Sequence, residues 1–372
     1  EPDKRKNRKK FGIMLKKYIP PANILFMVLL LMASGMIFLT PHARAQNTQE
    51  GHINSFVYHR FGNSRYPSTN ITMETFKEHL QFLKENNYRV ITLGEAAELL
   101  DSPAQIPQKT AVLTVDDGYK SFITHAVPLL EKYGYKATIF VCTKYVGRSG
   151  YLSWSDIRSL RKKGYEFGNH SHSHEHFLNL SDAQTRREFK EDLSRSEDLF
   201  HRHLGYQPDL YCYPYGEYNP DMQEILKNRG YKAAAAQKSG VIYTGSDHYA
   251  LPRFPMTSTY GEIEKFRSKA RMKALPVINE KPRNPEIKGE NPPGLTLRID
   301  PSAINPQGLQ CFVNGRKNCK ITRRRDTELI IEVEAKDKLT TRRTLYTITA
   351  PSKDGTRWKW YSHLWVNTQY GE

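Results

Sequence analysis

The feature that most constrains the fold is a regular alternation of short apolar runs with helical patterns, from residue 53 to about residue 270. Each apolar run has the length of a buried strand, and the segments between runs carry apolar residues at helical spacing. Such alternation indicates a parallel sheet or barrel with helices outside. The seven expected strands are 53–58, 89–92, 111–115, 137–141, 165–168, 209–213 and 231–235.

About seven strand–helix units favour a closed or nearly closed barrel over an open sheet. We therefore expect an α/β fold, a distorted (β/α)7-type barrel over residues 46–275. Helical patterns between the strands predict helices at 72–86, 119–133, 153–163, 181–204 and 220–229. Active sites of such barrels lie at the C-terminal ends of the strands.

After the barrel the composition changes. Five prolines interspersed with charges between Pro276 and Pro293 indicate a linker, residues 276–294. Alternating apolar runs without helices then predict a small all-β sandwich over residues 295–372. Cys311 and Cys319 flank the hairpin signal Asn314-Gly315, so we expect a disulfide between them across paired strands.

The N-terminal region predicts export. Residues 24–39 contain no charge, eight Lys or Arg precede them, and Ala43-Arg44-Ala45 fits a small-x-small cleavage site. These are the three parts of a secretory signal, cut after Ala45. The alternative is an uncleaved signal anchor, because a sixteen-residue apolar segment is only slightly shorter than a helix that spans a bilayer. We expect a periplasmic, extracellular or envelope-associated protein.

Net charge points in the same direction. The chain carries +17, of which residues 1–45 contribute +7, so +10 remains on the rest. A basic exported protein is attracted to an anionic surface such as a cell envelope. We expect no nucleic acid partner, because no basic-aromatic binding motif accompanies the charge.

Two short motifs carry candidate chemistry. Thr114-Val115-Asp116-Asp117-Gly118 ends one expected strand, and Gly168-Asn169-His170-Ser171-His172-Ser173-His174 ends another. A carboxylate and two imidazoles that converge there can hold a divalent metal with open coordination positions, and the other Asp is then free to act as a base. Spacing alone leaves the ligands open. Four histidines, at 170, 172, 174 and 176, share one face of a strand, whereas a helix pairs them four apart.

These motifs, followed by Tyr213-Pro214-Tyr215-Gly216, resemble the polysaccharide deacetylases, carbohydrate esterase family 4, over residues 53–257. The resemblance implies that Asp116 is the general base and that Asp117, His170 and His174 bind the metal. It implies Zn²⁺ as the expected ion, with Co²⁺, Ni²⁺ or Fe²⁺ as alternatives. It also implies an oxyanion donor at the backbone N–H of Tyr215, in a substrate loop of Tyr213, Pro214 and Tyr215.

The sequence departs from the family pattern at two places. Many relatives have an Arg where this chain has Cys212, and Arg253 resembles the arginine that some subfamilies use instead to orient the base. The usual C-terminal Leu-x-His motif is absent, and Leu275-Pro276-Val277 stands near its place. Val57-Tyr58-His59-Arg60 resembles the circularly permuted deacetylases of poly-β-1,6-N-acetylglucosamine, which makes His59 the candidate general acid.

The resemblance implies an exported, metal-dependent hydrolase that removes N-acetyl groups from a polysaccharide containing N-acetylglucosamine. A biofilm or surface polymer is the leading substrate, ahead of peptidoglycan and then chitin or O-acetyl esters. Two other classes stay open. One is a catalytically weak or silent polysaccharide-binding protein on the same scaffold, and the other is an amide hydrolase acting on small molecules.

Overall fold

The structure is a computed structural model that describes residues 51–102, 105–325 and 328–371. The predicted export signal, residues 1–45, lies outside this part of the chain. Within the described residues, no helix combines the length and apolar character needed to cross a membrane. All of the described residues belong to one compact unit.

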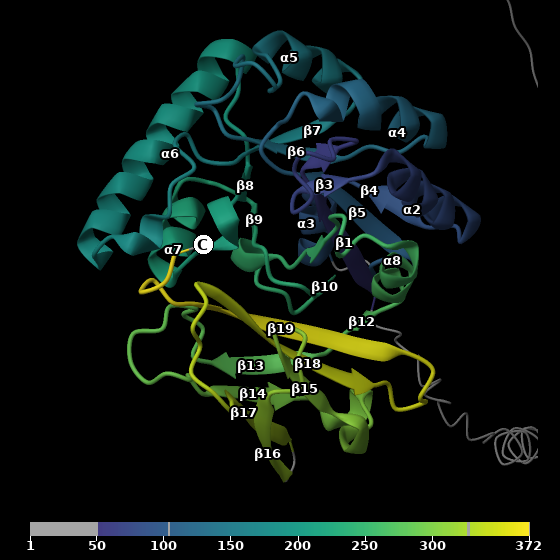
Figure 1. Cartoon of the computed structure of the whole chain (residues 1–372), viewed down its shortest axis with the longest axis vertical. Helices are drawn as coiled ribbons and strands as arrows, with labels where there is room; N and C mark the ends of the chain where they lie inside the picture. Colours follow the sequence, from purple (N-terminus) through teal and green to yellow (C-terminus); the bar gives the residue numbers. More distant parts are fainter. Residues whose placement is uncertain (1–50, 103–104, 326–327, 372) are drawn as a thin grey trace, which may run out of the picture. The chain divides into compact units, whose positions relative to one another are not determined.

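The central sheet has nine strands, and seven of them follow one another in the order β10-β1-β5-β6-β7-β8-β9 (Figure 1). In addition, β4 pairs with β5, and β11 pairs with β1. All pairs are parallel except β1 with β10. The expected distorted α/β barrel is confirmed. The strands are β1 (His52–Tyr58), β4 (Arg89–Ile91), β5 (Thr110–Val115), β6 (Thr138–Val141), β7 (Glu166–Asn169), β8 (Leu210–Cys212), β9 (Ala233–Ala235), β10 (Val241–Tyr243) and β11 (Phe254–Pro255). A separate two-stranded sheet pairs β2 (Arg60–Phe61) with β3 (Asn70–Ile71).

Helices cover the outer side of this sheet, as Figure 1 shows for α4, α5 and α6. They are α2 (Met73–Glu85), α3 (Leu93–Asp101), α4 (Val127–Tyr133), α5 (Trp154–Lys162), α6 (Asp182–Leu204), α7 (Pro220–Asn228) and α8 (Ile263–Ala270). The single helix expected over 119–133 is instead a π-helical turn, Phe122–Ala126, followed by α4. Pro128 explains the change, because it has no N–H for the regular ladder. Capping boxes at Thr92 and Ser153 start α3 and α5.

The register of the two central strands positions the site. Every residue of β1 and β5 is buried, as expected for parallel strands covered on both faces. They pair in parallel with Tyr58 opposite Val115. The residues that follow, His59 and Asp116, therefore leave the sheet side by side at its carboxyl edge.

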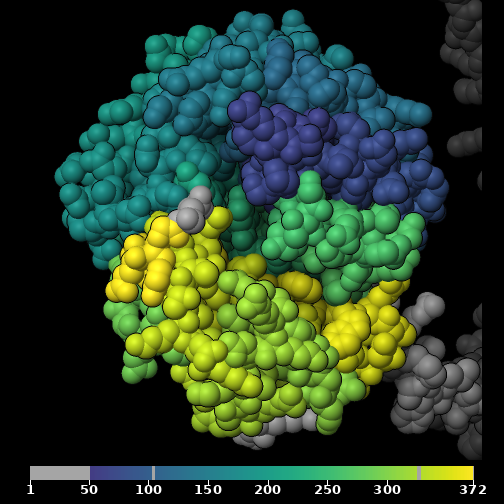
Figure 2. Space-filling view, in the orientation of Figure 1, coloured from purple at the N-terminus to yellow at the C-terminus, as the bar shows by residue number. Residues whose placement is uncertain are grey.

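The C-terminal part forms two four-stranded sheets, ordered β12-β19-β18-β15 and β13-β14-β17-β16. Residues from both sheets share one apolar core, including Leu297 and Ile331 from one sheet and Ile348 and Trp365 from the other. Figure 2 shows this part, in yellow, packed against the barrel. The strands are β12 (Lys273–Ala274), β13 (Val277–Lys281), β14 (Leu295–Ile299), β15 (Gln310–Val313), β16 (Cys319–Arg325), β17 (Leu329–Ala335), β18 (Arg343–Pro351) and β19 (Trp358–Val366).

Strand β13 lies inside the segment that composition marks as a linker, residues 276–294, and pairs with β14. Prolines do not prevent this pairing, because they lie before and after the strand rather than within it.

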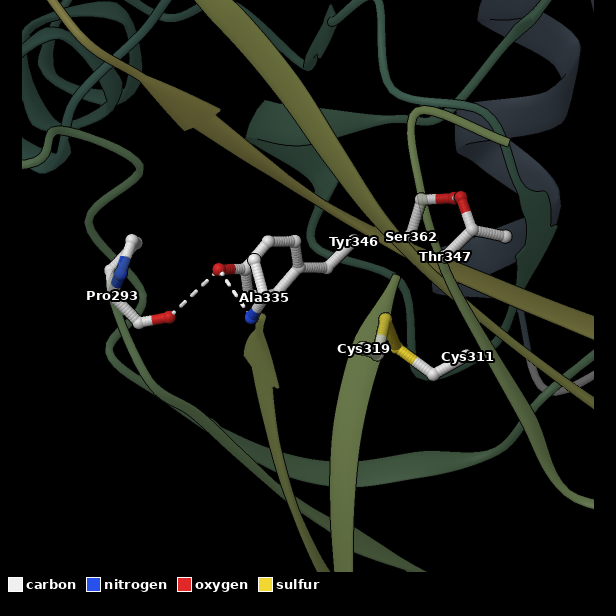
Figure 3. The surroundings of a disulfide bond; sticks show 7 residues. All are labelled: Pro293, Cys311, Cys319, Ala335, Tyr346, Thr347 and Ser362. Carbon is white, nitrogen blue, oxygen red and sulfur yellow. Dashed lines mark hydrogen bonds between the residues drawn. A yellow bond between two sulfur atoms is a disulfide. The ribbon is translucent and has the colours of Figure 1, made fainter. Parts of the chain in front are cut away.

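A disulfide joins Cys311 and Cys319, whose Cα atoms are 5.8 Å apart (Figure 3). The bond is the expected one, but its setting differs, because β15 and β16 belong to different sheets. It therefore links the two layers rather than two hydrogen-bonded neighbours. Tyr346 connects the layers a second time, since its hydroxyl accepts from the N–H of Ala335 and donates to the carbonyl of Pro293, at 3.0 and 3.1 Å.

Candidate active site

The site begins at the carboxyl ends of β1 and β5. The N–H of Asp116 donates to the carbonyl of Tyr58 at 2.9 Å, which continues the strand pairing by one residue. Beyond that bond the His59 imidazole lies next to the Asp116 carboxylate, with Nε2 3.9 Å from Oδ2. The Nδ1 atom of His59 is buried and has no hydrogen-bond partner within the described part of the chain. Burial lowers the pKa of His59, although the Asp117 and Asp116 carboxylates act in the opposite direction.

Arg253 also binds Asp116. It directly precedes β11, which pairs with β1, so the guanidinium enters the barrel beside β5. Nη1 donates to Oδ1 at 2.7 Å and Nη2 to Oδ2 at 2.9 Å, and both side chains are fully buried. Burial raises the pKa of Asp116, but the charge and hydrogen bonds of Arg253, together with the nearby His170 and His59, outweigh burial and leave this pKa below its usual value. Asp116 is therefore an ionised, fixed carboxylate at neutral pH.

The neighbouring carboxylate, Asp117, faces two imidazoles. Its Oδ1 atom lies 3.4 Å from Nε2 of His170 and 3.4 Å from Nε2 of His174. The three candidate ligand atoms all lie within 4.8 Å of one another. Asp117 has a φ of 71°, a left-handed conformation that is rare outside glycine and that clusters at functional sites. Burial raises the pKa of Asp117, but contacts with the His170 and His174 imidazoles and the charge of the nearby His59 together outweigh burial and hold this pKa well below its usual value.

His170 has the orientation that a metal ligand needs. Its Nδ1 atom lies 2.7 Å from the carbonyl oxygen of Cys212, an acceptor that fixes a proton on Nδ1, so that Nε2 is the nitrogen that faces Asp117 and can bind a metal once it is deprotonated. Burial lowers the pKa of His170, but its contacts with Cys212 and Asp117 outweigh burial and leave the pKa well above the usual value. The site therefore attracts positive charge, and two nitrogens with one carboxylate oxygen suit a divalent cation such as Zn²⁺.

The four histidines, whose spacing left the ligands open, are separated by their partners. His172 turns to Thr143, with Nδ1 3.0 Å from the hydroxyl oxygen, and His176 turns to Glu217, with Nδ1 3.1 Å from Oε2. Only His170 and His174 lie against Asp117. The segment is neither a strand nor a helix, because Ser171 and His174 both have positive φ.

Asp192, a residue that the motifs do not include, shapes this histidine loop. From α6 its carboxylate accepts the backbone N–H groups of His172 and Ser173 at 2.7 and 2.8 Å. The sequence does carry a signal for it. Asp192 lies three residues after Phe189 and directly before Leu193, which places a carboxylate on the buried face of the helix.

The Tyr215 loop closes the site opposite Asp117. The Tyr215 ring packs edge-on to His174, with centroids 4.7 Å apart, and its backbone is left-handed at φ 58°, ψ 3°. Tyr213 and Pro214, the two other residues expected in the substrate loop, have buried side chains. The Tyr213 hydroxyl donates inward to the carbonyl of Tyr249 at 3.0 Å. These two residues support the loop from inside, and only Tyr215 is partly exposed.

A second cluster of ligand-type atoms comprises Asp116, His170 and Cys212. Its donors already have other partners. Arg253 binds both oxygens of Asp116, and its Nη2 also lies 3.0 Å from the Cys212 sulfur. Burial raises the pKa of Cys212, so the sulfur stays a neutral thiol, a weak ligand. The first cluster is therefore the better metal site.

Comparison with known proteins agrees with this geometry. Residues 104–234 match the family model described as polysaccharide deacetylase. The chain is 27% identical over 197 residues to YxkH of Bacillus subtilis (strain 168), a protein named as a polysaccharide deacetylase, over 53% of this chain and 68% of YxkH. It is 24% identical over 214 residues to the poly-β-1,6-N-acetyl-D-glucosamine N-deacetylase of Staphylococcus aureus (strain MSSA476), over 54% of this chain and 72% of that protein.

In structure, the chain is similar to the Streptococcus pyogenes deacetylase PplD. The TM-score is 0.54 at 21% identity, over 59% of this chain and 99% of PplD. This similarity concerns the fold of the barrel.

Proposed function

Because this chain belongs to the polysaccharide deacetylase family, a family of hydrolases, we propose that it removes N-acetyl groups from a polysaccharide containing N-acetylglucosamine. One observation carries the proposal. The two adjacent carboxylates have different partners, Arg253 and His59 for Asp116 and two imidazoles for Asp117. This division gives one proton-accepting group and one cation-binding group within a single turn of chain.

The cation-binding group is Asp117 with His170 and His174, and Zn²⁺ is the ion that we propose. When bound, a divalent metal polarises the acetamide carbonyl and lowers the pKa of water. The chain's own contribution is to hold the three ligand atoms together. The Cys212 carbonyl orients His170, and Asp192 fixes the loop that carries His174.

Asp116 is the proposed general base. It is ionised at neutral pH because of Arg253, and the fork of that guanidinium fixes both of its oxygens. A carboxylate held in one orientation can accept a proton from the attacking water without first reorganising. Arg253 therefore acts as the positioning residue for this base.

His59 is the proposed general acid, and the N–H of Tyr215 the proposed oxyanion donor. The His59 side chain is 14% exposed, and its Nε2 atom lies 3.9 Å from Oδ2 of the proposed base Asp116. Its lowered pKa means that it gives up a proton readily to the departing amine once it has gained one. The left-handed turn at Tyr215 lies beside His174, near the developing negative charge.

A groove beside His59 supports a polymeric substrate. Its volume is about 600 Å³, and its lining includes Arg60, Tyr66, Tyr119 and Tyr151. The Tyr119 and Tyr151 rings lie 5.0 Å apart, and the Arg60 guanidinium lies 3.4 Å from the Tyr119 ring centroid. Aromatic faces of this kind pack against sugar rings, whereas a small-molecule amidase needs a more closed pocket.

Among polymers, poly-β-1,6-N-acetylglucosamine is our leading candidate. The S. aureus relative is named for that polymer, and His59 follows the first strand, as in the permuted deacetylases that the sequence resembles. Peptidoglycan and chitin are the alternatives. We propose that the protein is exported, which agrees with its predicted N-terminal signal and with the Cys311–Cys319 disulfide.

A sugar-binding protein without activity is the rival function. The departure at Cys212 favoured it, but Arg253 supplies the guanidinium that Cys212 lacks. Measuring acetate release separates the two functions. The purified protein, loaded with Zn²⁺, is incubated with β-1,6-N-acetylglucosamine, peptidoglycan and chitin oligomers, with and without chelator. We expect release that the chelator abolishes and Zn²⁺ restores. Binding of oligomers without acetate release would favour the rival.

A further inference from the structure

The C-terminal domain inserts an arginine into the barrel close to the site. Arg342 directly precedes β18 and donates to both oxygens of Glu217, each at 2.7 Å. The side chains of both residues are buried, 5% and 2% exposed. A third bond, from Nη1 to Asn179 Oδ1 at 2.8 Å, fixes the guanidinium plane. This bidentate pair joins two parts of the chain that are 125 residues apart.

Glu217 connects Arg342 to the loop that carries Tyr215. Its Oε2 atom lies 3.1 Å from Nδ1 of His176. The His176 ring in turn stacks on Tyr215, with centroids 3.7 Å apart and an angle of 11° between the planes. Arg342, Glu217, His176 and Tyr215 therefore form a continuous chain of contacts, which we call the Arg342 clamp.

The next residue makes a second, independent contact with the same loop. Nη1 of Arg343, the first residue of β18, donates to the backbone carbonyl of Tyr215 at 2.8 Å and to Oε1 of Gln237 at 3.3 Å. Fixing this carbonyl fixes the peptide plane that follows Tyr215. Two consecutive arginines thus hold one turn, one through side chains and the other through the backbone.

The turn needs such support because its backbone is strained. Tyr215 has a left-handed conformation, which costs a non-glycine residue free energy that surrounding contacts must offset. Gly216 follows with φ 72°, and a Cβ added there would lie 2.2 Å from the backbone N of Gln237. The loop is therefore tightly seated on the barrel at Gly216, while its conformation at Tyr215 depends on what packs from outside.

From these contacts we propose that the C-terminal domain is a working part of the active site. Arg342 and Arg343 are positioning residues that hold Tyr215, and with it the oxyanion-donating N–H, in its active geometry. This inference rests on the proposed function, since it assigns Tyr215 the same role. It gives the C-terminal domain a part in the reaction itself, separate from any binding of substrate.

The test compares Arg342→Gln, Arg342→Lys and Arg343→Gln with the wild type. Lysine keeps the charge of Arg342 but cannot reproduce its fork. Arg316→Gln is the matched control, because this arginine of the same domain is exposed in the hairpin turn, 26 residues before Arg342. For each variant, kcat, KM, bound zinc and thermal unfolding are measured, together with deuterium exchange in a peptide spanning residues 213–219.

We expect kcat to fall about 10–100-fold in the Arg342 variants, because a displacement of about 1 Å in a catalytic group has effects of this size. We expect KM to change less than about threefold, bound zinc to stay constant, and exchange in residues 213–219 to rise. Arg316→Gln should match the wild type in all of these. If Arg342→Gln does not fold, the same measurements on Arg342→Lys and Arg343→Gln test the proposal, since both substitutions leave the surrounding packing largely in place.

Folded variants with kcat within twofold of the wild type, or with unchanged exchange in residues 213–219, would overturn the proposal. The two levels of inference can be told apart. A wild type that releases no acetate contradicts the proposed function, whereas deuterium exchange still reports whether Arg342 holds the Tyr215 loop.

Discussion

Replacing Arg253 with methionine gives the sharpest test of how the base is held. The change keeps much of the volume of the side chain and removes its charge. Arg253 and Asp116 are both fully buried, so the variant leaves an unpaired carboxylate inside the barrel. Breaking a buried pair in this way costs about 3–5 kcal/mol. With an unfolding entropy of about 2.1 cal/mol/K per residue over the 317 described residues, each kcal/mol lowers Tm by about 1.5 °C, so we expect a fall of roughly 4–8 °C.

The same substitution predicts a change in pH dependence. In the wild type Arg253 is the largest of the contributions that offset burial and keep the pKa of Asp116 below its usual value. Without Arg253 the effect of burial dominates, and the pKa of Asp116 rises. A base must be ionised, so activity is lost as pH falls through this pKa. The acid limb of kcat/KM must therefore move to higher pH in Arg253→Met.

Acetate release between pH 4.5 and 9 and thermal unfolding at pH 7 measure both effects. Arg267→Met is the matched control, because Arg267 forms an exposed pair with Glu264 in which both side chains are well solvated. It should change stability by less than about 1 kcal/mol and leave the pH profile unaltered. Wild-type kcat/KM with an unshifted acid limb in folded Arg253→Met would refute the role assigned to Arg253.

Three further predictions follow from other parts of the structure. His59→Gln should lower kcat about 10²–10⁴-fold, the usual contribution of general acid–base catalysis, with bound zinc unchanged by elemental analysis; turnover near that of the wild type would remove His59 from the mechanism. His174→Ala should lose bound zinc and acetate release together, because His174 faces Asp117. His172→Ala should retain zinc, because the wild-type His172 ring contacts Thr143 instead. The opposite pattern would mean that the ligands are assigned wrongly. Burial lowers the pKa of His79 to about 4, against about 6.5 in an unfolded chain. The unfolded state therefore binds more protons between these values, so stability that is complete above pH 6.5 should fall by about 3 kcal/mol as pH drops from 6.5 to 4. Urea unfolding of the wild type and His79→Gln at several pH values measures this, and equal pH slopes in the two proteins would contradict it.

The barrel could be predicted from the sequence because its signals are local. Parallel strands buried on both faces give continuous apolar runs such as Thr110–Val115, and the capping residues Thr92 and Ser153 mark helix starts on their own. Strand β16 is hard to predict from sequence, because it is rich in arginine and lysine and its alternating pattern carries little apolar signal.

The ligand set could be predicted only through family resemblance. Spacing treats the four histidines as equivalent, and what separates them is a loop with two left-handed residues, Ser171 and His174. That loop is held by Asp192, which lies some twenty residues away on another element. Contacts at such a distance leave no periodic trace in one sequence. The pairing of Arg342 with Glu217 could not be predicted for the same reason, because in the sequence each residue alone resembles an ordinary surface charge.

Cys212 and Arg253 are best understood as two halves of one arrangement. Both lie at the carboxylate of Asp116, because Nη2 of Arg253 contacts Oδ2 and the Cys212 sulfur, and that sulfur lies 3.5 Å from the same oxygen. A second arginine at position 212 would bring two buried positive charges to a single carboxylate, with no room for either to be solvated. A cysteine is small, and burial keeps its thiol neutral. With Cys212 neutral, the single positive charge of Arg253 therefore balances the single negative charge of Asp116. The base can be oriented from β11 as effectively as from β8 because the strands of a barrel converge on the same edge. The cysteine at position 212 therefore fits an active site whose arginine directly precedes β11, and it does not count against catalysis.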